Sequence, residues 1–261
     1  METGLKGRTA LVTGGSKGIG YACARLLALE GVRVGITSRS EEHLAAARSR
    51  LAAEGLTVAT FAADLRDAAA AAQMVAAAES ALGPLDILVN SAGAAKRYAP
   101  ESLDAQAFHD TMDAKYFTTI HVLQPVVKTM AARGRGAVVN IVGMGGKVAG
   151  DFHIAGGAAN SAIMLATAGL AHAWARRGVR INAINPGATL TERLQEALAL
   201  EARQQGITED EALRNGQSRV PLGRYATPDD VARVAVFLAS DLAAYVTGAM
   251  IPMDGGSNPV I

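Results

Sequence analysis

The sequence predicts one doubly wound α/β domain, in which helices cover both faces of a seven-stranded parallel sheet. Short β-rich runs alternate along the 261 residues with longer alanine-rich stretches of helical periodicity. The β-rich runs are apolar almost throughout, as expected of parallel strands buried between two layers of helices. Such alternation gives right-handed crossovers between parallel strands, and the length suits a single domain with a sizeable core.

Seven segments are expected to form the strands. In order they are RTALVT (8–13), VRVGITS (32–38), LTVATF (56–61), LDILVN (85–90), GAVVNIV (136–142), VRINAI (179–184) and AMIPMDGG (249–256). The stretches between them carry periodic leucines and valines typical of packed helices, two of which are expected to end at Gly55 and Gly83. Because no linker or repeat interrupts the pattern, we expect residues 1–261 to form one domain.

Composition narrows the possible partners. The formal net charge is +1 and no basic stripe stands out, which argues against a nucleic-acid partner. No uncharged apolar run reaches the ~18 residues of a membrane span, and the start lacks a signal-peptide pattern. The single Cys23 excludes an internal disulfide and fits a reducing compartment. We therefore expect a cytoplasmic protein with no membrane and no metal partner.

The first predicted strand runs directly into a glycine-rich turn, TGGSKGIG (13–20). Gly14 permits a tight turn, whereas Gly18 and Gly20 let the backbone approach a pyrophosphate at the N-terminus of the next helix. The turn follows a strand, opens a helix and begins a βαβ unit, which favours a dinucleotide-binding site. A turn with a purely structural role is the alternative.

The end of the second predicted strand indicates which dinucleotide binds. Proteins that bind NAD usually place a carboxylate there to hold the ribose hydroxyls. This chain has Ser38 and Arg39 instead, and Lys17 in the glycine-rich turn adds a second cation. Two cations suit a 2′-phosphate, so we predict that NADP(H) is preferred over NAD(H). The alternative is that Arg39 is only a solvated loop residue.

Four further motifs follow in the chain: DLRD (64–67), NSAG (90–93), RGVRINAINPGATLT (177–191) and RYATPDDVARVAVFLASDLAAYVTGAMIPMDGG (224–256). With the glycine-rich turn, they make the chain resemble the short-chain dehydrogenases/reductases over nearly its whole length. The resemblance implies a Rossmann fold, a homotetramer or dimer, and a segment at about 190–221 that caps the substrate cleft. It implies a cofactor site formed by Gly14, Ser16, Lys17, Gly18, Ile19, Gly20, Ser38, Arg39, Asp64, Leu65, Asn90, Ala92, Gly93, Asn160, Pro186, Gly187 and Thr189.

The same resemblance exposes a difference at the catalytic positions. The family uses a tyrosine, a lysine four residues after it, a serine thirteen residues before it, and an asparagine on an earlier helix. Alignment through VVNIVGMGG places the serine position on Gly143, the tyrosine position on Gly156 and the lysine position on Asn160. The segment HDTMDAKYF places Lys115 at the asparagine position. All four residues therefore differ from those of the family.

Two side chains are candidates for a rebuilt site. Lys115 and Asn160 look like a reciprocal exchange, so the Lys115 ammonium is predicted to restore a cation beside the nicotinamide ribose. The alternative is that Lys115 extends to solvent and Asn160 is a product of drift. His153 lies one helical turn before the tyrosine position and titrates near neutrality, so it could transfer a proton. The alternative is a loop histidine outside the pocket.

Three classes of function remain compatible with the sequence. The first is an NADP(H)-dependent oxidoreductase that acts on a small carbonyl or hydroxyl substrate through Lys115, His153 and Asn160. The second is a pseudoenzyme that binds nucleotide or a partner subunit without turnover. The third is a non-redox lyase or hydratase on the same fold. The first is favoured because the exchange between 115 and 160 retains a charge where the cofactor needs one.

Overall fold

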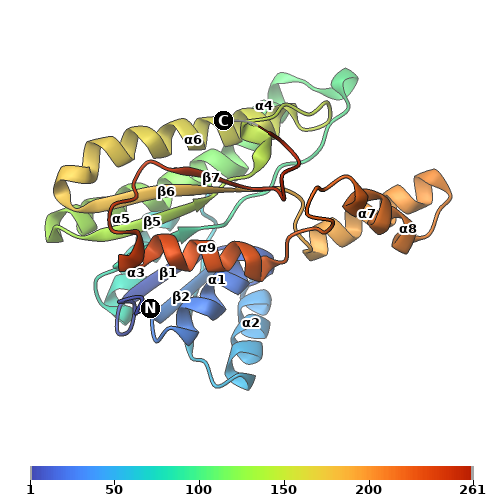
Figure 1. Cartoon of the computed structure of the whole chain (residues 1–261). Coiled ribbons are helices and arrows are strands. Elements are labelled where there is room, and N and C mark those ends of the chain that lie inside the picture. Colours follow the sequence, from blue (N-terminus) through green and yellow to red (C-terminus); the bar gives the residue numbers. More distant parts are fainter. Residues whose placement is uncertain (1, 260–261) are drawn as a thin grey trace.

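The computed structural model describes residues 2–259 and contains the seven-stranded sheet predicted from the sequence (Figure 1). All strand pairs are parallel, in the order β3-β2-β1-β4-β5-β6-β7. The strands are β1 (Thr9–Thr13), β2 (Arg33–Ser38), β3 (Val58–Ala62), β4 (Ile87–Asn90), β5 (Gly136–Ile141), β6 (Val179–Pro186) and β7 (Met250–Met253). The predicted doubly wound α/β fold is confirmed.

The helices connect these strands in sequence. They are α1 (Gly18–Leu29), α2 (Glu41–Ala53), α3 (Ala68–Leu82), α4 (Ala105–Thr111), α5 (Thr118–Arg133), α6 (Ile154–Trp174), α7 (Glu192–Gln205), α8 (Glu209–Ser218) and α9 (Pro228–Ala239). A π-helical turn, Met112–Phe117, joins α4 to α5. Gly55 follows the end of α2 with a φ of +76° and Gly83 caps α3 with a φ of +84°, as predicted.

Two hydrophobic cores hold the helices on opposite faces of the sheet. Strand residues such as Val12, Ile36 and Val89 pack with α1, α2 and α9 on one face. Their neighbours Leu11 and Leu88 point to the other face and pack with α3 and α5. Side chains alternate along a strand, and both faces are covered, so most strand positions are apolar. This explains why the strands read as continuous hydrophobic runs.

The segment predicted to cap the substrate cleft folds as the helix pair α7 and α8, which stands out from the sheet in Figure 1. The pair has a small core of its own around Leu198, Ala202 and Ala212. The Thr208 side chain accepts a hydrogen bond from the Glu211 amide, and the Glu211 side chain accepts one from the Thr208 amide. This reciprocal cap fixes the start of α8.

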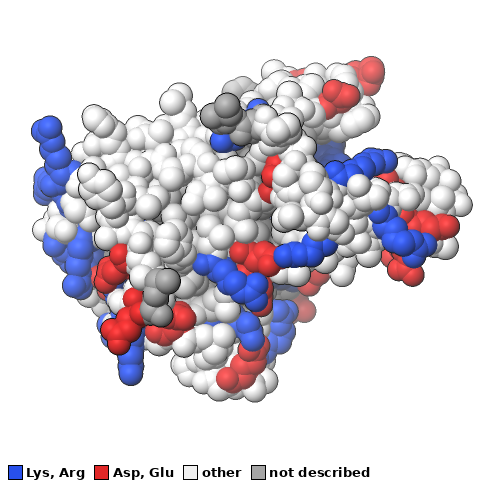
Figure 2. Space-filling view, in the orientation of Figure 1, with Lys and Arg blue, Asp and Glu red and all other residues white. Residues whose placement is uncertain are grey.

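One helical stretch, residues 154–177, is long and apolar enough by length and composition alone to cross a membrane. The expectation that no such run exists was wrong. The stretch is easily overlooked in the sequence because glycines, Asn160, Ser161 and Thr167 stand between its apolar residues. Its helix α6 packs against β6, and Ile163 and Thr167 lie buried there. Figure 2 shows few charged side chains over α6, whereas charges gather on the lower part of that face and on α7 and α8.

Candidate active site

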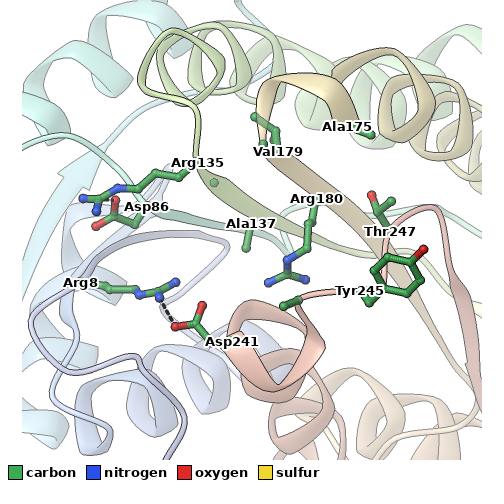
Figure 3. Close-up of a pocket in the computed structure, with 13 residues that line it drawn as sticks. Arg8, Asp86, Arg135, Ala137, Ala175, Val179, Arg180, Asp241, Tyr245 and Thr247 are labelled. Carbon is green, nitrogen blue, oxygen red and sulfur yellow. Dashed lines mark hydrogen bonds and ion pairs between the residues drawn. The ribbon is translucent and has the colours of Figure 1, made fainter.

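The amino edge of the sheet holds a cavity of about 590 Å³, drawn in Figure 3. Its charged groups already have partners. Arg8 forms an ion pair with Asp241, and Arg135 forms one with Asp86 at 3.2 Å. The Arg180 guanidinium donates to the carbonyl oxygens of Leu238, near the end of α9, and of Ser240, which follows the helix. These contacts tie the strand starts to neighbouring loops, which gives the cavity a structural role. The candidate active site lies at the opposite, carboxyl edge.

The glycine-rich turn is built so tightly that side chains would not fit. Gly14 has a φ of +64°, and a Cβ there would lie 2.9 Å from the Ala92 nitrogen and the Ser91 oxygen. A Cβ on Gly20 would collide with the Gly14 carbonyl. Gly18, with a φ of +54°, begins α1. The turn therefore exposes backbone amides at a helix N-terminus, where an anion is favoured.

The exit of β4 is fixed against this turn. The Thr13 hydroxyl accepts hydrogen bonds from the Ser91 and Ala92 amides, each at 3.1 Å. The Asn90 amide group donates to the Asn140 side chain at 2.9 Å, and that side chain donates to Thr167 at 2.9 Å. The sequence reasoning missed this chain of polar contacts, because its members come from three separate elements.

Unpartnered polar atoms mark the same edge of the sheet. Among the described residues, four buried side-chain oxygens have no hydrogen-bond donor: Thr37 Oγ1, Asn90 Oδ1, Asn160 Oδ1 and Asn185 Oδ1. A buried polar group without a partner costs free energy, so oxygens of this kind indicate a ligand-binding region. Together with the tight glycine cradle, they fit a dinucleotide along the carboxyl ends of β1, β2, β4 and β6.

Arg39 and Lys17 are the two cations predicted to bind a 2′-phosphate. Arg39 is exposed after β2 and forms no ion pair among the described residues. Lys17 precedes α1, and its ammonium pairs with Glu192 at 3.0 Å. Ser38 exchanges hydrogen bonds with the Ser40 backbone, so its hydroxyl shapes the turn. Glu192 was missed in the sequence, where nothing connects it to a residue 175 positions away.

The DLRD segment after β3 brings two predicted residues to different places. Asp64 lies at the surface, where a hydrogen bond from Arg66 lowers the pKa of its carboxyl to about 2. The Leu65 side chain is buried in the core, packed with α3 and α5. Its carbonyl oxygen lies 3.0 Å from His121 Nδ1. Only the Leu65 backbone therefore faces outward beside Asp64. Ile19 likewise packs partly into the core, so its backbone is the part available at the turn.

The Pro186–Gly187 turn after β6 closes the far end of the cleft. A Cβ on Gly187 would lie 3.0 Å from Asp254, so glycine allows the chain after β7 to approach. The Gly187 amide donates to the Met253 carbonyl at 3.0 Å. Thr189 is buried, and its hydroxyl donates to the Gly187 carbonyl at 3.2 Å. The turn and Thr189 thus form one fixed unit at the base of α7.

Lys115 lies inside the π-helical turn, partly buried. Wide turns of this kind are rare and are found mostly at functional sites. A Cβ on Gly93 would contact the Lys115 side chain at 3.5 Å, which places Lys115 over the exit of β4. Burial, with the nearby Arg193 charge, lowers the pKa of Lys115 to about 8. Its ammonium forms no ion pair with the residues that the structure describes.

The His153 ring is enclosed by two glycines. A Cβ on Gly156 would lie 2.6 Å from both ring nitrogens, and a Cβ on Gly145 would lie 2.7 Å from Cδ2. Real Cβ atoms do not approach other atoms so closely, so the ring occupies the space that a side chain at 156 would need. Burial, then the charges of Lys115 and Arg97, lowers the pKa of His153. The His153 ring therefore lies between Gly145 and Gly156.

Gly143 and Asn160 meet beside this histidine. A Cβ on Gly143 would lie 3.3 Å from Asn160 Nδ2, and one on Gly145 would lie 3.5 Å from the same atom. Gly143 also has a φ of +127°, a conformation that residues with side chains rarely adopt. Asn160 is buried. The predicted positions 143, 156 and 160 thus lie together around His153.

The first turn of α7 touches both ends of the cleft. Glu192 holds Lys17 at the glycine-rich turn, and Arg193 Nη2 donates to the Gly93 carbonyl at 3.5 Å. Thr191 lies against Gly18, 3.3 Å from the position of a Cβ there. These contacts hold the first turn of α7 against the glycine-rich turn and Gly93. That the segment at about 190–221 caps a substrate cleft stays a prediction.

Comparison with known proteins identifies the family. The family model described as enoyl-(acyl carrier protein) reductase matches residues 14–258. D-threitol dehydrogenase from Mycolicibacterium smegmatis is 37% identical over 252 residues, which cover 97% of this chain and 93% of that protein. Gluconate 5-dehydrogenase from Gluconobacter oxydans is 34% identical, with 97% and 95% covered. A crystal structure of an actinorhodin polyketide ketoreductase variant with NADPH superposes with a TM-score of 0.93 at 31% identity, over 100% of both chains. This chain is a member of the short-chain dehydrogenase/reductase family of oxidoreductases.

Proposed function

We propose that the protein is an NADP(H)-dependent oxidoreductase in which His153 transfers the proton to or from a small carbonyl or hydroxyl substrate. One observation carries this proposal. The His153 ring lies where a side chain on Gly156 would begin, with both ring nitrogens 2.6 Å from that position. A titratable group therefore occupies the space next to the position where the family has its catalytic tyrosine.

We take the four catalytic positions of the family, which fall on Lys115, Gly143, Gly156 and Asn160 in this chain, to have changed together. Gly156 and Gly145 make room for the His153 ring, and the backbone at Gly143 has a φ of +127°, which disfavours a serine. Lys115 supplies the cation that Asn160 does not. In this proposal His153 is the general acid or base, Lys115 supplies the positive charge of the site, and Asn160 is a polar side chain beside Gly143 and Gly145.

The cofactor site is assigned to the residues along the carboxyl edge. The Gly14–Gly20 turn would hold the pyrophosphate, and Arg39 and Lys17 would bind the 2′-phosphate. NADP(H) supplies or accepts the hydride at the substrate carbon. No carboxylate stands at the end of β2, so nothing there favours the unphosphorylated ribose of NAD(H).

In the reducing direction the His153 imidazolium would give its proton to the substrate oxygen, and in the oxidising direction neutral His153 would accept it. Lys115 would stabilise negative charge that develops on that oxygen, because its ammonium lies in a partly buried site where charge interactions are strong. Hydrogen bonds of Thr118 and Thr119 to the carbonyls of Asp113 and Lys115 hold the π-helical turn and therefore position this cation.

Cofactor preference is tested by calorimetric titration with NADPH and NADH. We expect tighter NADPH binding, and Arg39→Ala should weaken NADPH by about tenfold or more while leaving NADH nearly unchanged. Arg214→Ala, on the exposed face of α8, is the matched control. Equal affinities in the native protein would refute the assignment. Failure to bind either cofactor would favour the pseudoenzyme or lyase alternatives.

The role of His153 is tested by substitution and chemical rescue. His153→Ala should lower kcat by about 10²–10⁴-fold with little change in cofactor affinity. Added imidazole should restore part of the activity, because the enclosed space between Gly145 and Gly156 would admit the free ring. His172→Ala, an exposed histidine on the same helix, should change nothing. Full activity in His153→Ala would show that another group transfers the proton.

We also infer that the chain assembles into a homotetramer or dimer through the face over α6. Leu165, on α6, is 77% exposed, and Figure 2 shows few charged side chains over this helix. Leu165→Lys should shift the molecular mass in solution, measured by light scattering, toward the monomer. A native protein that is already monomeric would contradict this. A cytoplasmic location fits the single, buried Cys23.

A further inference from the structure

The first turn of α7 carries an acidic residue that holds one of the two cations assigned to the cofactor. A carboxylate oxygen of Glu192 lies 3.0 Å from the Lys17 ammonium, which joins the start of α7 to the glycine-rich turn. Arg39, the other assigned cation, forms no ion pair among the described residues. A phosphate that binds Lys17 must therefore displace or tolerate a carboxylate, whereas a phosphate that binds Arg39 need not.

The residues on either side of Glu192 hold it in this place. Thr191 Cγ2 lies 3.3 Å from the position of a Cβ on Gly18, so the backbone of α7 lies close against the glycine-rich turn. Arg193 Nη2 donates to the Gly93 carbonyl at 3.5 Å. The side chains of Lys17 and Glu192 are 47% and 62% exposed, and a pair so exposed contributes little to stability. Its consequence falls instead on whatever ligand needs the Lys17 ammonium.

The two nicotinamide cofactors differ only in the group that would meet this ion pair. NADP(H) carries a 2′-phosphate with about two negative charges, and NAD(H) carries a hydroxyl. If the ammonium leaves Glu192 for the phosphate, one charge-assisted hydrogen bond replaces another, so the net gain is small. If the ammonium stays, the Glu192 carboxylate repels the phosphate. Glu192 therefore weakens the binding of NADP(H) without weakening that of NAD(H).

We propose that Glu192 is a specificity residue for the cofactor, because it competes with the 2′-phosphate of NADP(H) for the Lys17 ammonium and so limits the preference for NADP(H). This inference rests on the proposed function, which assigns Lys17 and Arg39 to that phosphate. It adds a division of labour between them. Arg39 binds the phosphate without competition, and Lys17 binds it only after release from Glu192. NADP(H) therefore also detaches the first turn of α7 from the glycine-rich turn, whereas NAD(H) leaves the ion pair in place.

The first test is calorimetric titration of Glu192→Gln with NADPH and NADH. Glutamine keeps the length of the side chain and removes its charge. We expect Kd for NADPH to fall roughly threefold or more and Kd for NADH to stay the same. Glu196→Gln is the matched control, because Glu196 is an exposed glutamate one turn further along α7 that forms no ion pair among the described residues. Unchanged NADPH affinity in Glu192→Gln, or an equal gain for both cofactors, would overturn the inference.

A double-mutant cycle tests whether Glu192 acts through Lys17. In Lys17→Met, adding Glu192→Gln should leave Kd for NADPH unchanged, because no ammonium remains to be released. A gain of the same size in both backgrounds would mean that Glu192 acts directly on the phosphate, and it would overturn the competition for Lys17.

These outcomes separate the inference from the proposed function. A native protein that prefers NADPH, with a Glu192→Gln variant identical to it, would overturn only the inference. Equal affinities in the native protein, with a preference for NADPH in Glu192→Gln, would refute the cofactor assignment and support the role of Glu192.

The last test needs neither a variant nor turnover. Hydrogen–deuterium exchange of the native protein is measured by mass spectrometry with saturating NADP⁺ or NAD⁺. The amides of Leu194 and Gln195 donate to the Thr191 carbonyl at 2.9 and 3.0 Å, so their exchange reports on the first turn of α7. We expect faster exchange of these amides with NADP⁺ than with NAD⁺, because only NADP⁺ draws Lys17 away from Glu192. Equal exchange in the two complexes would show that the ion pair survives the phosphate, and it would overturn the inference.

Discussion

Adding one methyl group to Gly156 should remove activity without unfolding the protein. A Cβ at this position would lie 2.6 Å from both nitrogens of His153, whereas carbon and nitrogen atoms in contact are normally ~3.5 Å apart. The Cε1 atom of the ring would lie closer still, 2.1 Å from this Cβ. The ring must therefore move by about 1.4 Å or leave the site. Misplacement of a reacting group by about 1 Å can cost roughly 10²-fold in rate. We expect Gly156→Ala to lower kcat about 100-fold.

The free energy of unfolding, in contrast to activity, should change little. Alanine is favoured over glycine inside a helix by about 0.8–1.0 kcal/mol, and this gain offsets the strain of moving the ring. The free energy of unfolding of Gly156→Ala should stay within about 1 kcal/mol of the native value. Gly169→Ala, on the same helix with nothing within 4 Å of its Cβ, should stabilise the protein by about 0.8–1.0 kcal/mol and keep full activity.

The assay combines steady-state kinetics with denaturant unfolding and an NMR titration of His153. In Gly156→Ala the displaced ring should be more exposed to water, so its pKa should rise toward the ordinary value. His153→Ala and the double variant His153→Ala with Gly156→Ala should have the same kcat, because the ring that the methyl group displaces is absent. Normal kcat and a normal pH profile in Gly156→Ala would refute the assignment of His153.

Three other predictions concern titration. The pKa of His153 is lowered below 6.5 by burial and by the charges of Lys115 and Arg97. The rate of reduction should therefore decline, and the rate of oxidation should increase, as the pH rises through this lowered pKa. Arg97→Gln should shift the midpoint of both pH–rate profiles upward, and an unchanged midpoint would contradict this. Burial lowers the pKa of Lys115 from 10.5 to about 8, so the unfolded chain binds this proton more tightly than the folded chain. Lys115→Met should therefore raise the free energy of unfolding at pH 7 by about 1–3 kcal/mol, and urea titrations should show this gain diminishing between pH 8 and 10.5. Burial raises the pKa of the Cys23 thiol to about 12, so Ellman's reagent should label native protein at least ~10²-fold more slowly than unfolded protein; equal rates would disprove this.

The fold was predictable because local pattern and global fold agree in this chain. The apolar strands, the glycine-rich turn after β1 and the helix ends at Gly55 and Gly83 each follow from short-range rules.

The arrangement of the candidate site was only partly predictable. Spacing within α6 brings His153 near Gly156, but nothing in the sequence shows that the ring also lies against Gly145. The pairing of Lys17 with Glu192 and the hydrogen bond of Arg193 to the Gly93 carbonyl depend on how distant segments pack. Such contacts are set by tertiary structure, which periodicity and motif spacing in a single sequence do not encode.

The enclosure of His153 between glycines also constrains the evolutionary history of this site. A tyrosine introduced at position 156 would collide with the His153 ring, and a serine introduced at 143 would be forced into a backbone conformation with a φ of +127°. Each of these side chains would require a prior change in its surroundings. If His153 transfers the proton as proposed, proteins that share this arrangement by descent should retain glycines at 143, 145 and 156 together with the histidine.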